Sequence, residues 1–519
     1  MAGRLVKSTL VTGSMTFVSR ISGLVRDVVL ASFIGASATV AADAFYVAFR
    51  IPNFFRRIFG EGAFSQSFVP VLSEYRSRDD ALSIRLFISH MSASLGLVLL
   101  ALVLAGIVFS SGVVTVLAPG FLDDPEKFSI TVTMLQITFP YLLFISLVAM
   151  AAGIMNAYHQ FAVPAFTPVL LNLCMIAAAL LLAPLMDGSA IALAWGVFAA
   201  GFVQLLFQFP ALKKMGLLVA PKPDWKDPGV RQVGKLMVPA IIGSSVAQIN
   251  LLINTLLASF LVTGSVSWLY YSDRLMEFPL GIFGIALATV ILPALADTHQ
   301  KRGADEFSVL LDWGLRWCFL IGLPASVALI LLAEPLVATI FQYGAFTAYD
   351  VVMAGQSLVA FSIGLPGLIL VKVLAPGFFA RQDTRTPAKV AVISVSVNII
   401  MSLLLFKPMA HVGLALAVSI AAYVNCGLLF WYLRRDRVFI PQPGWTSYLA
   451  KVLLACAVMG AVLMAGAGDT ALWTESSLVY RVTRLTALIM AGIASYFIIV
   501  LIMRIPVKAM LTDRRLKNV

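Results

Sequence analysis

Charged residues are scarce in this chain. Only 12% of its 519 residues are Asp, Glu, Lys or Arg, whereas 60% are hydrophobic. A soluble protein of this size does not need so much apolar surface. Apolar runs long enough to cross the roughly 30 Å hydrocarbon core of a bilayer recur from end to end, and no polar interval is long enough for a separate soluble domain. Composition therefore predicts an all-α polytopic membrane protein.

Residues that hold metals or perform catalysis are also few. The four cysteines lie inside apolar runs without a CxxC spacing, and the four histidines are far apart without an HxxxH or HExxH spacing. The chain has no GxxxxGK[ST] motif, which excludes a P-loop ATPase site, and no cleavable signal follows its N-terminus. We expect no metal site, no cofactor and no disulfide, and we expect the protein not to be an enzyme.

The net charge of +12 does not indicate a nucleic-acid-binding protein. In a membrane protein, a positive excess is typical of basic cytoplasmic loops beside anionic lipid headgroups. We therefore expect membrane lipids, and not nucleic acid, as the partners of these charges.

Apolar runs of about 20 residues predict fourteen transmembrane helices. The second and eighth contain Pro52 and Pro279, where we expect kinks. The expected spans are 9–33, 39–72, 85–112, 128–157, 163–184, 189–212, 236–262, 266–296, 309–334, 349–379, 387–406, 411–434, 446–468 and 480–503.

Lys and Arg in the connections predict the orientation, because basic residues near the ends of spans collect on the cytoplasmic side. They cluster in alternate connections and at both ends of the chain, whereas the other connections are nearly free of them apart from Lys127 and Lys407. Arg481 and Arg484 are the main exceptions. We expect a multi-pass membrane protein with both termini in the cytoplasm.

An internal repeat links the second and eighth spans. Arg50 aligns with Arg274 at an offset of 224 (274 − 50), and the IFG at 58–60 aligns with the IFG at 282–284. An offset of six spans inserts both halves in the same direction, so the repeat predicts two six-helix lobes related by a pseudo-two-fold axis along the membrane normal, with a cavity between them. The expected divisions are an N-lobe at 1–220, a C-lobe at 221–438, and two extra helices with a basic tail at 439–519.

Arginines inside these spans are the candidate binding residues. An Arg facing lipid at mid-bilayer costs roughly 2.5 to 3.5 kcal/mol, so these side chains should line something polar. The guanidinium group is a planar fork of donors that matches phosphate oxygens, so an excess of Arg over acids favours a phosphate or pyrophosphate ligand. The candidates are Arg20, Arg26, Arg50, Arg56, Arg57 and Arg274, with Asp27, Asp43, Glu61, Asp273 and Glu277 as supporting acids.

A structural alternative exists for each of these arginines. Arg20 with Asp27, Arg50 with Asp43 and Arg274 with Glu277 could be buried ion pairs that only hold helices together.

Arg56 and Arg57 could instead extend to the cytoplasmic headgroups, and the Pro52 kink leaves open which of the two faces inward. Lys372, another cation inside a span, has two open roles: lining the cavity or bonding a local carbonyl.

Several long motifs resemble the MurJ (MviN) family of lipid II flippases, within the multidrug/oligosaccharidyl-lipid/polysaccharide exporter superfamily. The resemblance covers essentially the whole chain. The motifs are SRISGLVRD at 19–27, DAFYVAFRIPNFFRRIFGEGAFSQSFVPVLSEY at 43–75, GSVSWLYYSDRLMEFPLGIFGIALATVILP at 264–293, LAPGFFARQDTRTP at 374–387 and PQPGW at 441–445.

The resemblance implies a flippase of the bacterial inner membrane that moves lipid II, the undecaprenyl-pyrophosphate-linked peptidoglycan precursor, to the periplasmic leaflet by alternating access for cell wall synthesis. It implies functional cavity arginines at Arg20, Arg26, Arg56 and Arg274, an acid at Asp43, and a lipid-tail groove formed by the two extra helices. Arg50 stands where relatives often carry Lys. No clear counterpart of the sodium-site carboxylates of some members is present, so the coupling ion or membrane potential stays open. Cell-wall synthesis or division proteins are further expected partners.

The sequence leaves two alternative functions open. One is a flippase for another lipid-linked oligosaccharide, such as O-antigen, which charge alone does not distinguish. The other is an integral-membrane glycosyltransferase, which would need catalytic acids or histidines on a surface loop. A cationic-drug exporter would line its cavity with acids, so the arginines argue against it.

Overall fold

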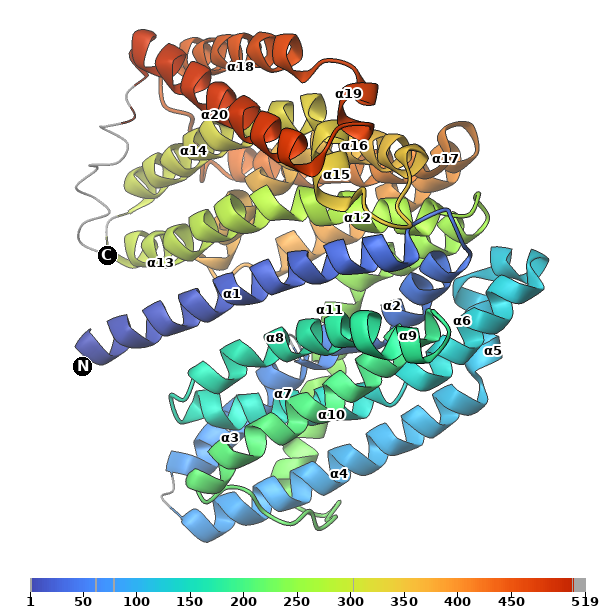
Figure 1. Cartoon of the computed structure of the whole chain (residues 1–519). Helices are drawn as coiled ribbons and strands as arrows, with labels where there is room; N and C mark the ends of the chain where they lie inside the picture. The colour runs from blue at the N-terminus through green and yellow to red at the C-terminus, as the bar shows by residue number, and fades with distance from the viewer. Residues whose placement is uncertain (1, 61–62, 78–79, 302, 506, 508–519) are drawn as a thin grey trace. The chain divides into compact units, whose positions relative to one another are not determined.

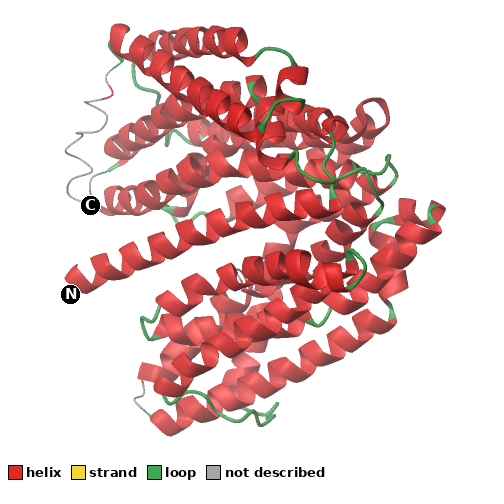
Figure 2. Cartoon of the chain, viewed as in Figure 1, coloured by secondary structure: helices red, strands yellow, loops and turns green. Residues whose placement is uncertain are grey.

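The computed structural model describes residues 2–60, 63–77, 80–301, 303–505 and 507. These residues form helices joined by short connections, and this described part of the chain contains no strand (Figure 2). The prediction of an all-helical protein is therefore confirmed. Because a helix satisfies its own backbone N–H and C=O groups, it is the element expected in an apolar surrounding.

The helices fall into two compact units. The first unit comprises Met1–Val266 and Tyr343–Phe346, and the second comprises Ser267–Gln342 and Thr347–Val519. The lobes expected at 1–220 and 221–438 are a different division of the chain and stay a prediction.

The first eleven helices of Figure 1 belong to the first unit. They are α1 (Ala2–Ile34), α2 (Ala41–Gly60), α3 (Ala63–Ser77), α4 (Ala81–Val108), α5 (Ser110–Leu117), α6 (Pro125–Thr138), α7 (Tyr141–Ala157), α8 (Ala162–Ala177), α9 (Ala183–Leu185), α10 (Ile191–Lys214) and α11 (Pro228–Ser259).

The remaining helices belong to the second unit, apart from the first two residues of α12. They are α12 (Ser265–Pro279), α13 (Ile285–Lys301), α14 (Ala304–Leu331), α15 (Ala333–Phe341), α16 (Ala348–Phe379), α17 (Arg385–Arg435), α18 (Trp445–Ala467), α19 (Thr470–Thr474) and α20 (Leu478–Ile502).

Ten helical segments of the described residues are long and apolar enough to cross a membrane. Three of them combine shorter helices, at Pro125–Ala157, Ala162–Leu185 and Ser265–Lys301. The protein is thus polytopic, as expected from its composition. The fourteen expected spans stay a prediction.

Helix α17 is a hairpin and not one straight rod. The Ser394 hydroxyl donates to the Ala421 carbonyl at 2.8 Å, although 27 residues of straight helix would separate them by about 40 Å. Between them, Ala410 leaves the helical region at φ 49° and ψ −133°. The expected spans 387–406 and 411–434 therefore correspond to its two antiparallel arms.

The predicted interruption at Pro279 coincides with a change of helix type. Helix α12 ends at Pro279, and a π-helical turn over Leu280–Gly284 leads into α13. A proline cannot donate the backbone hydrogen bond of a regular helix, and π turns often occur where the ladder is disturbed. Pro52 lies within α2, which continues to Gly60.

A short segment of the α15–α16 connection belongs to the first unit. The Ala345 N–H donates to the Ser32 carbonyl of α1 at 2.9 Å. Glycine is required on both sides of this contact: a Cβ on Gly35 would lie 2.4 Å from the Ala345 oxygen, and one on Gly344 would lie 2.2 Å from the Ser32 oxygen. Both glycines also have positive φ, at 65° and 56°.

The PQPGW motif anchors the last helices to α14. Both Asp312 oxygens are used: Oδ1 accepts from the Gln442 N–H at 2.9 Å and from Trp445 Nε1 at 2.6 Å, and Oδ2 accepts from Arg316 Nε at 2.7 Å. The Arg316 guanidinium lies 5.0 Å and 5.2 Å from the ring centroids of Trp445 and Tyr448. This cluster fixes the start of α18, which lies beside α20 (Figure 1).

We predict that Arg316→Ala lowers the stability of the purified protein by about 3 kcal/mol, because it leaves the nearly buried Asp312 without its counter-charge. Arg435→Ala is the matched control. Arg435 also pairs with one Asp and stacks on two aromatic rings, but its side chain is 53% exposed against 17% for Arg316. We expect a change below about 1 kcal/mol there. Unfolding curves in detergent micelles measure the stability of both variants. An equal loss of stability in the two variants would contradict the role of the Asp312 cluster in anchoring α18.

Candidate functional site

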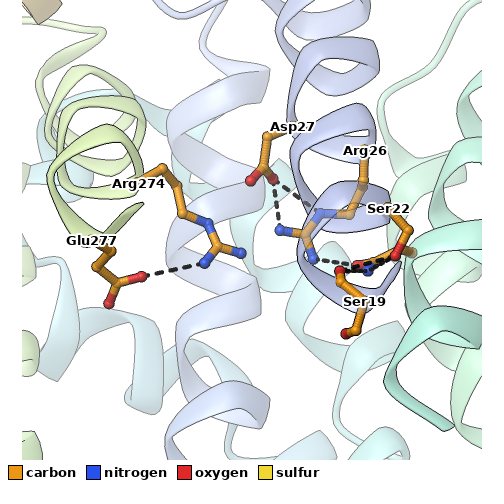
Figure 3. Close-up of polar contacts among 7 residues, drawn as sticks. Ser19, Ser22, Arg26, Asp27, Arg274 and Glu277 are labelled. Carbon is orange, nitrogen blue, oxygen red and sulfur yellow. Dashed lines mark hydrogen bonds and ion pairs between the residues drawn. The ribbon is translucent and has the colours of Figure 1, made fainter. Parts of the chain in front are cut away.

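Arg26 and Asp27 form a buried pair on α1. Arg26 is 4% exposed and Asp27 2% exposed, and the Asp27 Oδ1 accepts from Arg26 Nη2 at 2.6 Å and from Nε at 3.0 Å. Figure 3 shows the two side chains turned toward each other. An unpaired ion at this depth would carry a large desolvation penalty, so each side chain stabilises the other.

Asn172 of α8 completes this cluster. Its Oδ1 accepts from Arg26 Nη1 at 3.0 Å, and its Nδ2 donates to the Ser22 hydroxyl at 2.8 Å and to the Ser19 carbonyl at 3.3 Å. Arg26 thus donates from all three of its nitrogens, and its guanidinium ties α1 to α8. The sequence did not indicate Asn172, because 146 residues separate it from Arg26.

Arg20 differs from Arg26 in its surroundings. It is half-buried on α1, and it has no hydrogen-bond or ion-pair partner among the residues that the structure describes. The alternative pairing of Arg20 with Asp27 is therefore wrong, because the neighbouring Arg26 reaches that carboxylate. The guanidinium of Arg20 keeps its donors for another acceptor.

Three further arginines lie on α2, and all are half-buried. Arg56 Nε donates to the Asn53 side chain at 3.0 Å. Arg57 has no partner within the described part of the chain, whereas Arg50 has contacts of its own. Glu61, one of the expected supporting acids, lies outside the described residues.

Asp43 is the one acid in α2, and its residue is only 1% exposed. Its Oδ2 accepts from Lys127 Nζ of α6 at 2.9 Å and from the Gly264 N–H at 2.9 Å. The Lys127 ammonium also lies 3.4 Å from the Thr263 hydroxyl and 4.3 Å from the centroid of the Phe121 ring. In the sequence Lys127 only counts as a stray charge on the non-cytoplasmic side, whereas the structure makes it the counter-ion of Asp43.

Arg274 of α12 pairs with Glu277 one turn later. Nη1 of Arg274 lies 3.4 Å from Glu277 Oε2, and the guanidinium is 5.7 Å from the Tyr270 ring centroid (Figure 3). Both side chains are more than a third exposed, so this pair is weaker than the two in the first unit. The neighbouring Asp273 is half-buried.

Two hydrogen bonds hold α12 against α16. Trp268 Nε1 donates to Asp350 Oδ1 at 2.8 Å, and the Ser272 hydroxyl donates to the Ala354 carbonyl at 2.6 Å. Trp268, Ser272 and Asp350 are all fully buried. They fix the helix from which the Arg274 side chain extends.

Lys372 of α16 is exposed and lies beside the π-helical turn that follows α12. Its Cγ is 3.3 Å from the place where a Cβ of Gly284 would be. No hydrogen bond or ion pair involves it within the described ranges. Of the two roles left open for Lys372, the local-carbonyl role therefore has no support.

The chemistry that these residues offer is recognition of an anion. Arg20 and Arg57 pair with no residue in the described ranges, Arg56 bonds to Asn53 and Arg274 to Glu277, and Arg26 is held by Asp27 and Asn172. The described residues contain no group of three or more His, Cys, Asp or Glu placed to hold a metal ion.

Comparison with known proteins gives a consistent result. The sequence model of the family described as "Lipid II flippase MurJ" matches residues 30–483. The chain is 45% identical over 512 residues to the "Probable lipid II flippase MurJ" of Vibrio cholerae, covering 97% of each protein. It also resembles the solved structure "Lipid II flippase MurJ, inward closed conformation", with a TM-score of 0.80 and 27% identity over 94% of this chain and 98% of that one.

A more distant likeness concerns the fold alone. An inward-facing multidrug resistance MATE family transporter of the MOP superfamily matches with a TM-score of 0.64 at 13% identity, over 83% of this chain and 98% of that one. This likeness shows that the chain shares the fold of that transporter.

We predict that Lys127→Met destabilises the protein by about 3 to 5 kcal/mol, because it leaves the Asp43 carboxylate buried without its counter-charge. The double variant Asp43→Asn with Lys127→Met should recover part of that loss, since it removes both charges. Denaturant or thermal unfolding in micelles measures the effect.

Lys301→Met serves as its control, because Lys301 pairs with Asp297 but is 69% exposed. We expect a change below about 1 kcal/mol there. A double variant as unstable as the sum of its single variants would show that Asp43 and Lys127 are not coupled.

Proposed function

The chain belongs to the MurJ family of lipid II flippases, and on that premise we propose that it moves lipid II from the cytoplasmic to the periplasmic leaflet by alternating access. The family is one of transporters, not of enzymes. The observation that carries the proposal is the similarity to curated flippases over nearly the whole chain. No bond is made or broken in this step. The protein provides a polar path for the headgroup while the prenyl chain stays in lipid.

The proposed topology has fourteen spans with both termini in the cytoplasm. The ten apolar segments become fourteen when the two arms of α17 are counted separately and α1, α2 with α3, and α11 are added. These additions were expected to span from the sequence. Two six-helix lobes related by an axis along the membrane normal, followed by α18 and α20, complete the proposal.

Within this proposal the arginines bind the pyrophosphate. Arg20, Arg50, Arg56, Arg57 and Arg274 supply donors, and each charged hydrogen bond to a phosphate oxygen is worth about 1.5 to 3 kcal/mol. Arg26 acts as a positioning residue, because its donors are engaged with Asp27 and Asn172.

The acids limit and orient this positive charge. Asp27 neutralises Arg26, Asp43 neutralises Lys127, and Glu277 lies beside Arg274. Asp273 and Glu61 are expected to contribute in the same way. Arg20 and Arg57, which pair with no acid among the described residues, remain for an anionic ligand.

The two alternative functions are not equally supported. A glycosyltransferase is set aside, because the family is one of transporters. A flippase for another lipid-linked oligosaccharide shares the pyrophosphate group and the fold. The curated relatives that carry the name of lipid II flippase favour lipid II over it. Binding partners among cell-wall synthesis or division proteins stay a prediction.

Depletion of the protein in its native host tests the function. We predict that lipid II accumulates in the cytoplasmic leaflet, as measured by an assay that labels or modifies lipid II only on the periplasmic side. A parallel assay of O-antigen-type lipid carriers separates the rival, which predicts accumulation of those carriers instead. Normal leaflet distribution of lipid II after depletion would contradict the proposal.

The arginine site has its own test. We predict that Arg20→Ala, Arg57→Ala and Arg274→Ala weaken binding of lipid II to the purified protein by about tenfold each, since each loses a charged hydrogen bond. Arg85→Ala is the control, because Arg85 is an exposed arginine of α4. Thermal unfolding curves establish that every variant is folded. Wild-type affinity in all three folded variants would contradict an arginine-bound pyrophosphate.

A further inference from the structure

A second polar site lies in the second unit, and none of the candidate arginines is among its lining residues. It is a cavity of about 200 Å³ where the end of α14, the start of α15, α16, the end of α18 and α19 meet. Its lining includes Glu334, Gly355, Ala467, Gly468, Thr470 and Trp473. Because a water molecule occupies about 30 Å³, the cavity has room for a small polar headgroup.

Glu334 gives this cavity a negative charge. Its Oε2 accepts a hydrogen bond from the Thr470 hydroxyl, and no Lys, Arg or His among the described residues forms an ion pair with it. Gly355 of α16 permits this position, because a Cβ there would lie 2.8 Å from the Glu334 Cγ. The Oε1 atom therefore remains as an acceptor for a cationic ligand.

Arg484 of α20 provides a positive charge beside the same cavity. Its Nη2 would lie 3.0 Å from a Cβ on Gly468, and its guanidinium is 5.4 Å from the ring centroid of Trp473. Gly468 and Trp473 both line the cavity. Arg484 donates to the Gly466 carbonyl from Nε and Nη2 and to the Tyr480 hydroxyl from Nη1, which leaves two of its five N–H groups.

A carboxylate in the cavity lining and a guanidinium beside the lining residues Gly468 and Trp473 are complementary to a zwitterion. We propose that this cavity binds the headgroup of an ethanolamine phospholipid. The primary ammonium donates to Glu334, the phosphate accepts from Arg484, and the acyl chains remain in the bilayer. A choline headgroup lacks the N–H donors that Glu334 needs, and a glycerol headgroup lacks the cation.

The position of the cavity agrees with a lipid ligand. Trp is enriched where a membrane helix meets the headgroup region, and Trp473 is fully buried beside the ends of α14 and α18. In the proposed topology these helix ends lie on the periplasmic side. The lipid would therefore come from the periplasmic leaflet of the membrane that the protein spans. Only this choice of leaflet rests on the proposed function. The headgroup chemistry does not depend on it.

Native mass spectrometry of the full-length protein tests the site. Phosphatidylethanolamine, phosphatidylcholine and phosphatidylglycerol with identical acyl chains are titrated separately. We expect the ethanolamine lipid to bind about tenfold more tightly than the other two, and Glu334→Gln to abolish this preference. Equal binding of all three lipids to the wild type, or an unchanged preference in Glu334→Gln, would overturn the proposal.

Three variants separate a ligand site from a structural one. Glu475→Gln makes the same chemical change on an exposed residue directly after α19 and should keep the preference. Thr470→Val removes the internal hydrogen bond but keeps the carboxylate, so it should lower thermal stability and keep the preference. Ala467→Leu fills the cavity and should weaken ethanolamine lipid binding without changing the charge.

A purely structural role for Glu334 gives a different pattern. The carboxylate would then only favour the N-terminus of α15 and hold Thr470. In that case Glu334→Gln and Thr470→Val both lower stability and neither changes lipid preference. Competition by soluble O-phosphoethanolamine as strong as by the lipid itself would also count against a membrane ligand.

Discussion

The cost of holding a charge among apolar helices is the constraint on which this structure depends. A buried ion needs a counter-charge or several hydrogen bonds, or it destabilises the fold by several kcal/mol. The chain meets this need repeatedly with short, complete networks. Arg26 is matched by Asp27 and Asn172, Lys127 by Asp43, and Arg316 by Asp312. Each network also joins helices that are distant in sequence, so charge compensation and helix packing are the same set of contacts.

This pairing divides the positive charges into two groups. One group is neutralised inside the fold and contributes to its stability. The other, which includes Arg20 and Arg57, has no acid of its own in the described part of the chain. Retaining such residues is unfavourable for stability alone, and anion recognition is the physical reason that the proposed function supplies. The same distinction separates Glu334, which pairs with no cation among the residues that the structure describes, from the paired acids.

Much of the fold could be predicted from the sequence, because hydropathy and length decide where helices form. The all-helical class, the separation of the two arms of α17 and the interruption at Pro279 follow from apolar runs and proline chemistry. The partners of the charges could not be predicted in this way. Asp27 pairs with the adjacent Arg26 and not with Arg20, and Asp43 pairs with a lysine 84 residues away. The ion-pair partners depend on how α1 packs on α8 and how α2 packs on α6. Local sequence patterns do not predict this packing.

The segment Tyr343–Phe346 has a consequence for how the protein is made. It belongs to the first compact unit, although 76 residues of the second unit precede it, from Ser267 to Gln342. Its Ala345 N–H meets the Ser32 carbonyl, and Gly344 and Gly35 allow the backbones to touch. Translation proceeds from the N-terminus, so the first unit cannot be complete until residue 346 has left the ribosome. Helix α1 therefore lacks its contact with residues 343–346 while α12 to α15 are synthesised.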